Sequence, residues 1–100
     1  MQRFGEIVRA ARIKKGLSLH QVASASGTFK GYICGIEHGS NPPPSPKVVA
    51  KIAKVLDLDY HELLARSAFE KLPKGLRFVF LQDILAEATV AGRSEAMGRG

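Results

Sequence analysis

Residues Ser18 to Gly39 read SLHQVASASGTFKGYICGIEHG, a pattern typical of two short helices joined by a tight turn. Ser18 is a good helix N-cap, and Gln21 lies three residues later, where a capping box places Glu or Gln. Gly27 then stands where a left-handed residue ends a helix at the least steric cost. We therefore predict a first helix that begins after Ser18 and ends at Gly27.

A second helix is predicted between this turn and Gly39, which is placed to end it. Ile33 and Ile36 recur at i and i+3 and give the helix one apolar side. Two helices with a glycine-containing turn between them form the unit that places its second helix in the major groove of DNA. The residues that lie away from the apolar side are Lys30, Gly31, Cys34 and Gly35.

Three further helices are predicted on either side of this pair. The first of them ends at Gly16. Another begins with Ser45 as N-cap and Pro46 at the first helical position, after three consecutive prolines that predict a stiff extended loop. A short one begins at a capping box formed by Asp59 and Glu62. The apolar faces of the first two are Phe4, Ile7, Val8 and Ala11, and Val48, Val49, Ile52, Ala53 and Leu56.

These residues together resemble the helix-turn-helix domain of the Cro and phage-repressor type, the XRE family. The resemblance extends from about Phe4 to Leu64 and implies an all-α fold with a five-helix lambda-repressor-like DNA-binding domain. It further implies a bacterial or phage transcriptional regulator, usually a repressor or autoregulator, that binds operator DNA as a dimer in the cytoplasm, at the nucleoid. The residues that carry it are Arg12, Lys15, Gly16, Leu17, Ser18, Val22, Ala23, Gly27, Ile33, Ile36, Glu37 and Gly39.

The resemblance also implies which residues contact double-stranded DNA. The base-facing positions correspond to Lys30, Gly31 and Gly35, and donors around the readout helix are expected to reach phosphates. Leu19 stands where a Gln commonly grips a phosphate, so one such contact is absent or replaced. The predicted DNA-binding set is Thr28, Phe29, Lys30, Gly31, Tyr32, Gly35, His20, Gln21, His38, Ser40 and Asn41, with Lys14 and Lys15 as outer candidates.

The two glycines are unexpected at base-facing positions, because glycine offers no side chain to a base edge and costs a helix about 1 kcal/mol relative to Ala. Four explanations stay open: close approach of the backbone to the groove, readout of DNA shape, a protein partner, or glycines that are simply tolerated. Phe29 either touches a thymine methyl group or fills the core. Tyr32 has a hydroxyl that can reach a phosphate or a base.

Other charged and reactive residues receive structural assignments. By the resemblance, Arg12 and Glu37 form an internal ion pair that orients the readout helix without contacting DNA. Cys34 is expected to be a small, half-buried filler. The outward lysines of the helix after the prolines form either a solvated face or a part of the DNA-attracting field. They are Lys47, Lys51 and Lys54.

Composition agrees with this interpretation. A chain of 100 residues, 45% of them hydrophobic, is large enough for one core. Its net charge is +6, and ten basic against five acidic side chains lie at or before Arg66. One cysteine cannot form an internal disulfide, and no metal-ligand spacing, membrane-spanning run or cofactor motif is present in the sequence. Catalysis is not indicated, since neither a phosphate loop nor a histidine paired with a nucleophile is found.

The remainder of the chain holds one more predicted helix, from Leu76 to Val90, with a wider apolar face than a surface helix needs. This face either packs against the domain core or forms a self-complementary dimer contact, alone or combined with such packing. We divide the chain into a DNA-binding domain (1–66), a C-terminal helix for dimerisation (67–91) and a flexible tail (92–100). The predicted dimerisation residues are Leu76, Phe78, Val79, Phe80, Leu81, Ile84, Leu85 and Ala88.

Two functions follow from these features. The first is a sequence-specific regulator that binds an inverted-repeat operator as a homodimer. The second is a protein-interaction module or antitoxin-like protein that uses the same fold to hold a partner. Autorepressors, antitoxins, restriction controllers and regulators of anti-CRISPR operons share this domain, and the sequence does not separate them.

Overall fold

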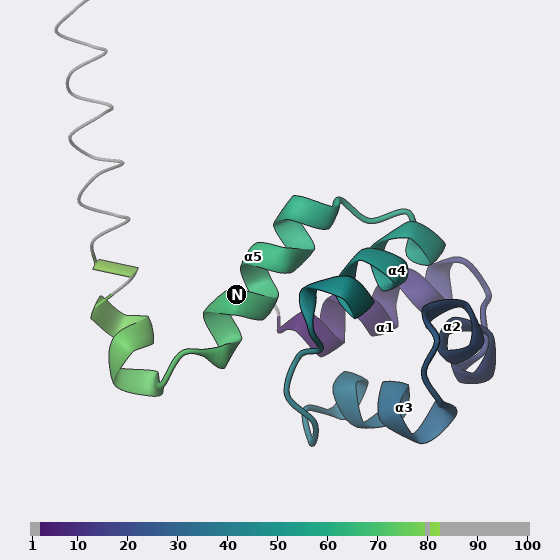
Figure 1. Cartoon of the computed structure of the whole chain (residues 1–100), viewed down its shortest axis with the longest axis horizontal. Coiled ribbons are helices and arrows are strands. Elements are labelled where there is room, and N and C mark those ends of the chain that lie inside the picture. Colours follow the sequence, from purple (N-terminus) through teal and green to yellow (C-terminus); the bar gives the residue numbers. More distant parts are fainter. Residues whose placement is uncertain (1–2, 80, 83–100) are drawn as a thin grey trace, which may run out of the picture.

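A computed structural model describes residues 3–79 and 81–82 of the chain. Within this part every regular element is a helix, so the predicted all-α fold is confirmed. Five helices lie between residues 4 and 71, and residues 74–79 and 81–82 are helical as well. The five, labelled in Figure 1, are α1 (Phe4–Lys14), α2 (Leu19–Ser26), α3 (Lys30–His38), α4 (Pro46–Leu56) and α5 (Tyr60–Lys71).

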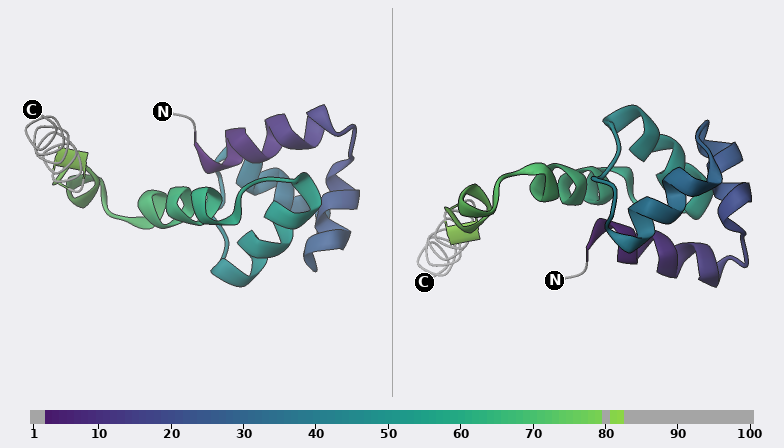
Figure 2. Two further views of the ribbon diagram at one scale, coloured as in Figure 1. Left: turned by 90° about the horizontal axis from the view of Figure 1, so that it is seen from above. Right: turned by 90° about the horizontal axis from the view of Figure 1, so that it is seen from below.

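The five helices enclose one apolar core. Helix α1 packs against α3, α4 and α5, while α2 packs against both α3 and α4 (Figures 1 and 2). None of the helices in the described part is long and apolar enough to cross a bilayer. The buried apolar residues come from all five helices and are Phe4, Val8, Val22, Ala23, Ile33, Ile36, Val49, Ile52, Ala53, Leu56 and Leu63.

The local signals around α2 and α3 are confirmed. Gln21 N donates to Ser18 Oγ (3.0 Å) and Ser18 N donates to Gln21 Oε1 (2.8 Å), which completes the capping box. Gly27 and Gly39 end their helices in the left-handed conformation, with φ of 71° and 79°. A side chain at φ values in this region is strained, and glycine is not.

The crossing of α1 and α3 depends on a glycine that the sequence analysis did not single out. Gly5 is buried, and a Cβ atom at this position would lie 2.1 Å from Ile36 O and 3.0 Å from Glu37 Cα. Both are backbone atoms, which cannot move aside as a flexible side chain can. The backbones of the two helices therefore meet directly, without side chains between them.

Helix α5 is longer than expected. Its start is as predicted, with Glu62 N donating to Asp59 Oδ1 (3.0 Å), but the helix continues past residue 66 to Lys71. The added turns serve the fold, because Ser67 Oγ (3.3 Å) and Lys71 Nζ (2.9 Å) both donate to Pro44 O. They hold the proline loop that connects α3 to α4. The boundary placed after residue 66 thus falls inside a continuous helix.

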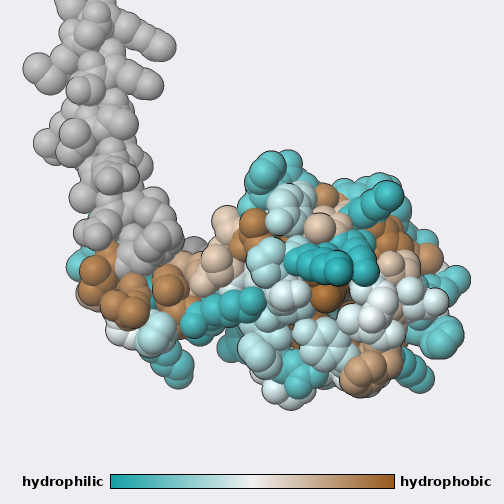
Figure 3. Space-filling view, in the orientation of Figure 1, coloured by the Kyte–Doolittle hydropathy of each residue, from teal (hydrophilic) through white to brown (hydrophobic). Residues whose placement is uncertain are grey.

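The helical segment after α5 stands away from the five-helix body (Figures 1 and 2). Leu76, Phe78 and Val79 are 55%, 64% and 51% exposed, and Figure 3 shows apolar atoms gathered on this segment. The alternative in which this face packs against the core is therefore wrong for these three residues. Leu81 is half-buried. The other predicted dimerisation residues, Phe80, Ile84, Leu85 and Ala88, and the predicted tail, 92–100, lie outside the described residues.

Candidate nucleic-acid interface

Helix α3 turns one side to the core and leaves the start of the opposite side open. Ile33 and Ile36 are 0% and 3% exposed, as their spacing predicted. Lys30 and Gly31, in the first turn, are exposed, and a Cβ atom at Gly31 would meet no atom within 4 Å. In the described part of the chain, nothing covers the start of this helix.

An aromatic pair stands beside this open turn. Phe29 is the N-cap residue of α3, yet its side chain makes no capping hydrogen bond and is 71% exposed. Its ring centroid lies 6.0 Å from that of Tyr32, at an interplanar angle of 49°. The alternative in which Phe29 fills the core is therefore wrong. Tyr32 is half-buried and packs against the edge of the core.

The two unexpected glycines of α3 differ in their surroundings. A Cβ atom at Gly35 would lie 2.2 Å from Asn41 Nδ2 and 3.3 Å from Ser40 Oγ, because the loop after α3 folds back over the helix. Asn41 Nδ2 donates to Tyr32 O (3.4 Å) and Ser40 Oγ to Gly35 O (3.2 Å). Contact within the chain thus accounts for Gly35. It does not account for Gly31, which faces open space.

The residues predicted around the readout helix lie at the start of α2 and the end of α3. His20 and Gln21 are exposed; the Gln21 amide oxygen is used by the capping box, which leaves the amide nitrogen as the donor. His38 is exposed at the end of α3, with Nδ1 2.8 Å from Cys34 O. Thr28 is different, because its hydroxyl lies 3.0 Å from Ser26 Oγ and donates to Ala23 O (3.4 Å). It is turned into the protein.

The predicted ion pair between Arg12 and Glu37 is present. Arg12 Nε donates to Glu37 Oε2 (2.7 Å), Nη2 donates to Oε1 (3.0 Å), and Nη1 donates to Leu17 O (3.0 Å). The hydrogen bond to Glu37 raises the pKa of Arg12, against the opposing effect of burial. Two parallel hydrogen bonds fix direction as well as distance. The pair therefore sets how the last turn of α3 lies on α1.

The basic side chains of the predicted DNA-attracting surface differ in whether they are free or paired within the protein. Lys47, Lys51 and Lys54 are all exposed, as expected for an outward stripe. A Cβ atom at Gly27 would lie 3.4 Å from Lys51 Nζ, so this ammonium group lies beside the turn between α2 and α3. Lys15 Nζ, by contrast, lies 2.5 Å from Asp57 Oδ2 and is held at the end of α4.

Residues 3–67, about two thirds of the chain, match the family model described as a helix-turn-helix domain. The chain belongs to the helix-turn-helix domain family. Among curated proteins, it is 33% identical over 69 residues to the HTH-type transcriptional repressor RghR of Bacillus subtilis. That match covers 69% of this chain and 51% of RghR. The chain spans about half the length of the first such relatives.

Solved helix-turn-helix structures are similar over the same region. SinR, described as the master regulator for biofilm formation, in complex with DNA is 34% identical, with a TM-score of 0.56 over 61% of this chain and 97% of that one. A structure of a SinR protein/SinI protein complex is 28% identical, with a TM-score of 0.56 over 89% of this chain and 81% of that one. The predicted family and fold are confirmed.

Sequence reasoning missed two contacts that position the helix-turn-helix. Gly5 lies within the predicted first helix, and an isolated glycine there is a signal of close packing that could have been used. Glu70 accepts a hydrogen bond from Phe4 N (2.6 Å), 66 residues away. No pattern in a single sequence pairs residues at that separation.

Proposed function

We propose that the chain is a sequence-specific DNA-binding transcriptional regulator that reads the major groove with the first turn of α3. The observation that carries this proposal is the uncovered side of α3 at Lys30 and Gly31, on a helix whose opposite side is fixed in the core. A helix held in this way can enter a major groove without rearrangement of the protein. The name of the repressor RghR and the SinR–DNA structure support the same conclusion.

Base contacts come from few side chains on this surface. The Lys30 ammonium can donate to guanine O6 and N7. Gly31, with no side chain and no protein atom nearby, lets the helix backbone approach the groove. The exposed Phe29 ring can contact a thymine methyl group or a sugar. Direct readout is therefore limited, and DNA shape supplies part of the specificity.

Phosphate contacts surround this turn. The exposed donors at the start of α2, His20 and Gln21, face one side of the groove, and His38 serves the other. Lys51, beside the turn, adds to the attraction. The predicted contacts of Thr28, Gly35, Ser40 and Asn41 are not part of this proposal, because each is engaged or covered within the chain.

The regulator acts as a homodimer on an inverted repeat, in the cytoplasm and without a cofactor. Support for a dimer comes from the exposed apolar side chains of Leu76, Phe78 and Val79, on the helical segment that stands away from the five-helix body (Figure 1). A two-fold dimer presents two readout helices to two half-sites about one helical turn apart. Repression, including autorepression, follows if such an operator overlaps a promoter.

The proposal is tested on a duplex taken from upstream of the chain's own coding sequence, with titrations over a range of salt concentrations. We expect the logarithm of affinity to fall with that of salt by about 0.9 per neutralised phosphate. Lys30→Ala should weaken binding about tenfold or more. Lys74→Ala removes the same charge from an exposed residue at the far end of the molecule and should bind as the parent does. Equal affinity for parent and Lys30→Ala would reject α3 as the readout element.

A second candidate function is a protein-interaction module. The same exposed apolar residues after α5 favour it, as does the existence of a SinR–SinI complex among similar structures. A partner held by apolar area should bind with little salt dependence, in contrast to DNA. Binding of a protein partner that vanishes in Phe78→Asp but persists in Lys30→Ala would support this function over DNA readout.

A further inference from the structure

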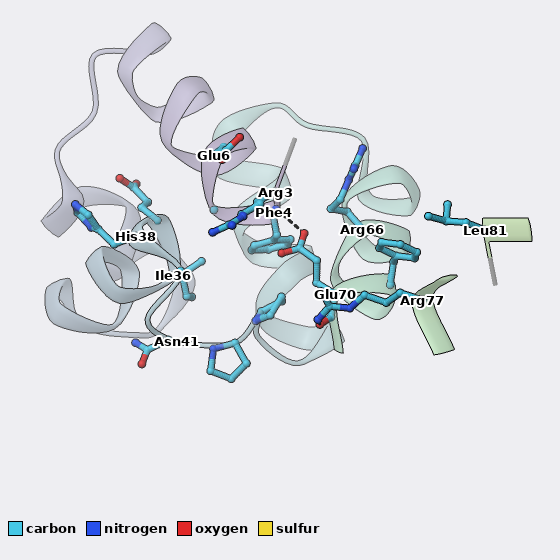
Figure 4. A pocket seen from close by; sticks show the side chains of 16 residues that line it. Arg3, Phe4, Glu6, Ile36, His38, Asn41, Arg66, Glu70, Arg77 and Leu81 are labelled. Carbon is cyan, nitrogen blue, oxygen red and sulfur yellow. Dashed lines mark hydrogen bonds between the residues drawn. The ribbon is translucent and has the colours of Figure 1, made fainter. Parts of the chain in front are cut away.

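Helix α1 begins without a cap of its own and takes one from α5. Its N-cap residue, Arg3, makes no side-chain capping bond. Instead Phe4 N donates to Glu70 Oε2 at 2.6 Å, and Figure 4 shows the Glu70 carboxylate turned toward this end of α1. A carboxylate at a helix N-terminus also interacts favourably with the helix dipole. The last turn of α5 is thus fixed to the start of α1.

Arg77 closes the turn that follows α5. Its Nε donates to Leu72 O (2.7 Å), its Nη2 donates to Glu70 O, and its backbone N donates to Pro73 O (3.0 Å). The guanidinium therefore occupies carbonyl groups that a helix end leaves without partners. The Arg77 side chain thus ties the segment after the connection, residues 72 and 73, back to Leu72 and to the last turn of α5.

These contacts continue to the readout helix. Next to Phe4, the bare backbone of Gly5 rests on Ile36 and Glu37 of α3. From α3 to α1, then through Glu70 and Arg77 to residues 74–82, each step is a backbone contact or a hydrogen bond to backbone. No step depends on a mobile surface side chain alone, so the direction of the last segment is tied to that of α3.

We propose that Glu70 and Arg77 are positioning residues that fix the direction in which residues 74–82 leave the helix-turn-helix body. Since Leu76, Phe78 and Val79 lie on this segment, its direction sets the separation of the two α3 helices in a dimer, and so the accepted spacing of half-sites. The part that concerns half-sites rests on the proposed function. The part that concerns direction does not.

The reason to assign this role to Arg77 is that, beside the half-buried side chain of Leu81, its guanidinium makes the side-chain hydrogen bonds that join the described part of this segment to the end of α5. Leu76, Phe78 and Val79 are each more than half exposed, so their side chains are not packed into the core of the body. Pro73 fixes its own φ but leaves the following rotations free. Without the guanidinium, two connecting residues would act as a hinge.

The first experiment measures direction within one chain. Cys34→Ser removes the single native thiol, and Ser24→Cys with Gln82→Cys places spin labels on exposed positions of α2 and the last segment. Labelled chains are diluted with unlabelled chains, and electron–electron distances are measured. We expect one narrow distance peak in the parent, its loss in Arg77→Ala, and its retention in Lys74→Ala, which removes the same charge nearby. An unchanged peak in Arg77→Ala overturns the proposal.

Glu70 is tested with a conservative variant. Glu70→Gln keeps an oxygen that accepts from Phe4 N and should keep the narrow peak, whereas Glu70→Ala should broaden it. If Glu70→Ala does not fold, the Arg77 variant still decides, because Arg77 lies outside the core. A narrow peak in folded Glu70→Ala would remove Glu70 from the assignment.

The second experiment separates this inference from the proposed function. Sedimentation gives the oligomeric state, and duplexes selected from a random library are re-made with the half-site spacing changed by about 5 base pairs, half a turn. A dimeric parent should reject the changed spacing, and Arg77→Ala should lose that discrimination while it still binds. A monomeric parent contradicts the dimer of the proposed function, and the intramolecular distances still decide the role of Arg77. A dimeric Arg77→Ala with parental discrimination overturns the spacing role.

Discussion

The guanidinium of Arg12 grips both carboxylate oxygens of Glu37, joining the third turn of α1 to the last turn of α3. The Glu37 side chain is 2% exposed and that of Arg12 is 15% exposed. The pair lies at the end of α3 that is away from Lys30. The pair therefore fixes α3 at its C-terminal end and leaves the exposed first turn free for contact with DNA.

Removal of one partner should destabilise the fold strongly. In Arg12→Ala, Glu37 would remain as a buried, unpaired carboxylate, and we expect a loss of about 3–5 kcal/mol in the free energy of unfolding. Denaturant titration followed by circular dichroism measures it. The control is Arg9→Ala, an exposed arginine of the same helix, which should change stability by less than about 0.5 kcal/mol. Equal losses of unfolding free energy in Arg12→Ala and Arg9→Ala would show that the ion pair does not stabilise the fold.

The same pair predicts a flat pH response. Because hydrogen bonding raises the pKa of Arg12, its contribution to stability is fully present below the unfolded-state value and is lost only as pH rises through the folded-state value. Between neutral and mildly alkaline pH, the parent and Arg12→Ala should therefore differ by a constant amount. A difference that shrinks across this range, measured by denaturant titration, would contradict this.

Gly5 and Gly31 should respond oppositely to the same change. Gly5→Ala drives a methyl group into Ile36 O, and we expect about 1–3 kcal/mol of destabilisation from overpacking. Gly31→Ala meets open space and should stabilise α3 by up to about 1 kcal/mol through helix propensity. Thermal unfolding of the two variants measures both effects. Loss of stability in Gly31→Ala would mean that this glycine serves the fold.

Phe29→Ser should separate stability from binding. Phe29 occupies the N-cap of α3 with φ of −131° and ψ of 160° but provides no capping bond, whereas serine can accept one. We expect a gain of about 1 kcal/mol in stability together with weaker DNA binding. Thermal unfolding and DNA titration on one preparation measure the two changes. Phe29→Ala, which removes the ring without supplying a cap, should weaken DNA binding without the stability gain.

The elements that short-range chemistry determines were predictable. Ser18 with Gln21, and the left-handed Gly27 and Gly39, define the ends of α2 and α3 within a few residues of chain, and the structure has them as predicted. The ion pair of Arg12 and Glu37 was found only because the family resemblance supplied it. Periodicity identified the buried side of α3 because each apolar residue reports on its own helix face.

Contacts between distant segments were not predictable from one sequence. The contact of Gly5 with Ile36 and the bond of Glu70 to Phe4 N depend on how the helices cross, which no local pattern encodes. The length of α5 was underestimated for a similar reason. Its last turns are held by the carbonyl of Pro44 rather than by a capping signal of their own.

The fold-back of Asn41 over Gly35 limits how much of α3 another molecule can touch. Because the loop covers α3 at Gly35, the exposed first turn with Lys30 and Gly31 is left for contact with base edges. On the proposed function, each subunit therefore distinguishes only a few base pairs. Most of the specificity for an operator must then come from the presence of two copies of a short base sequence and from the number of base pairs between them.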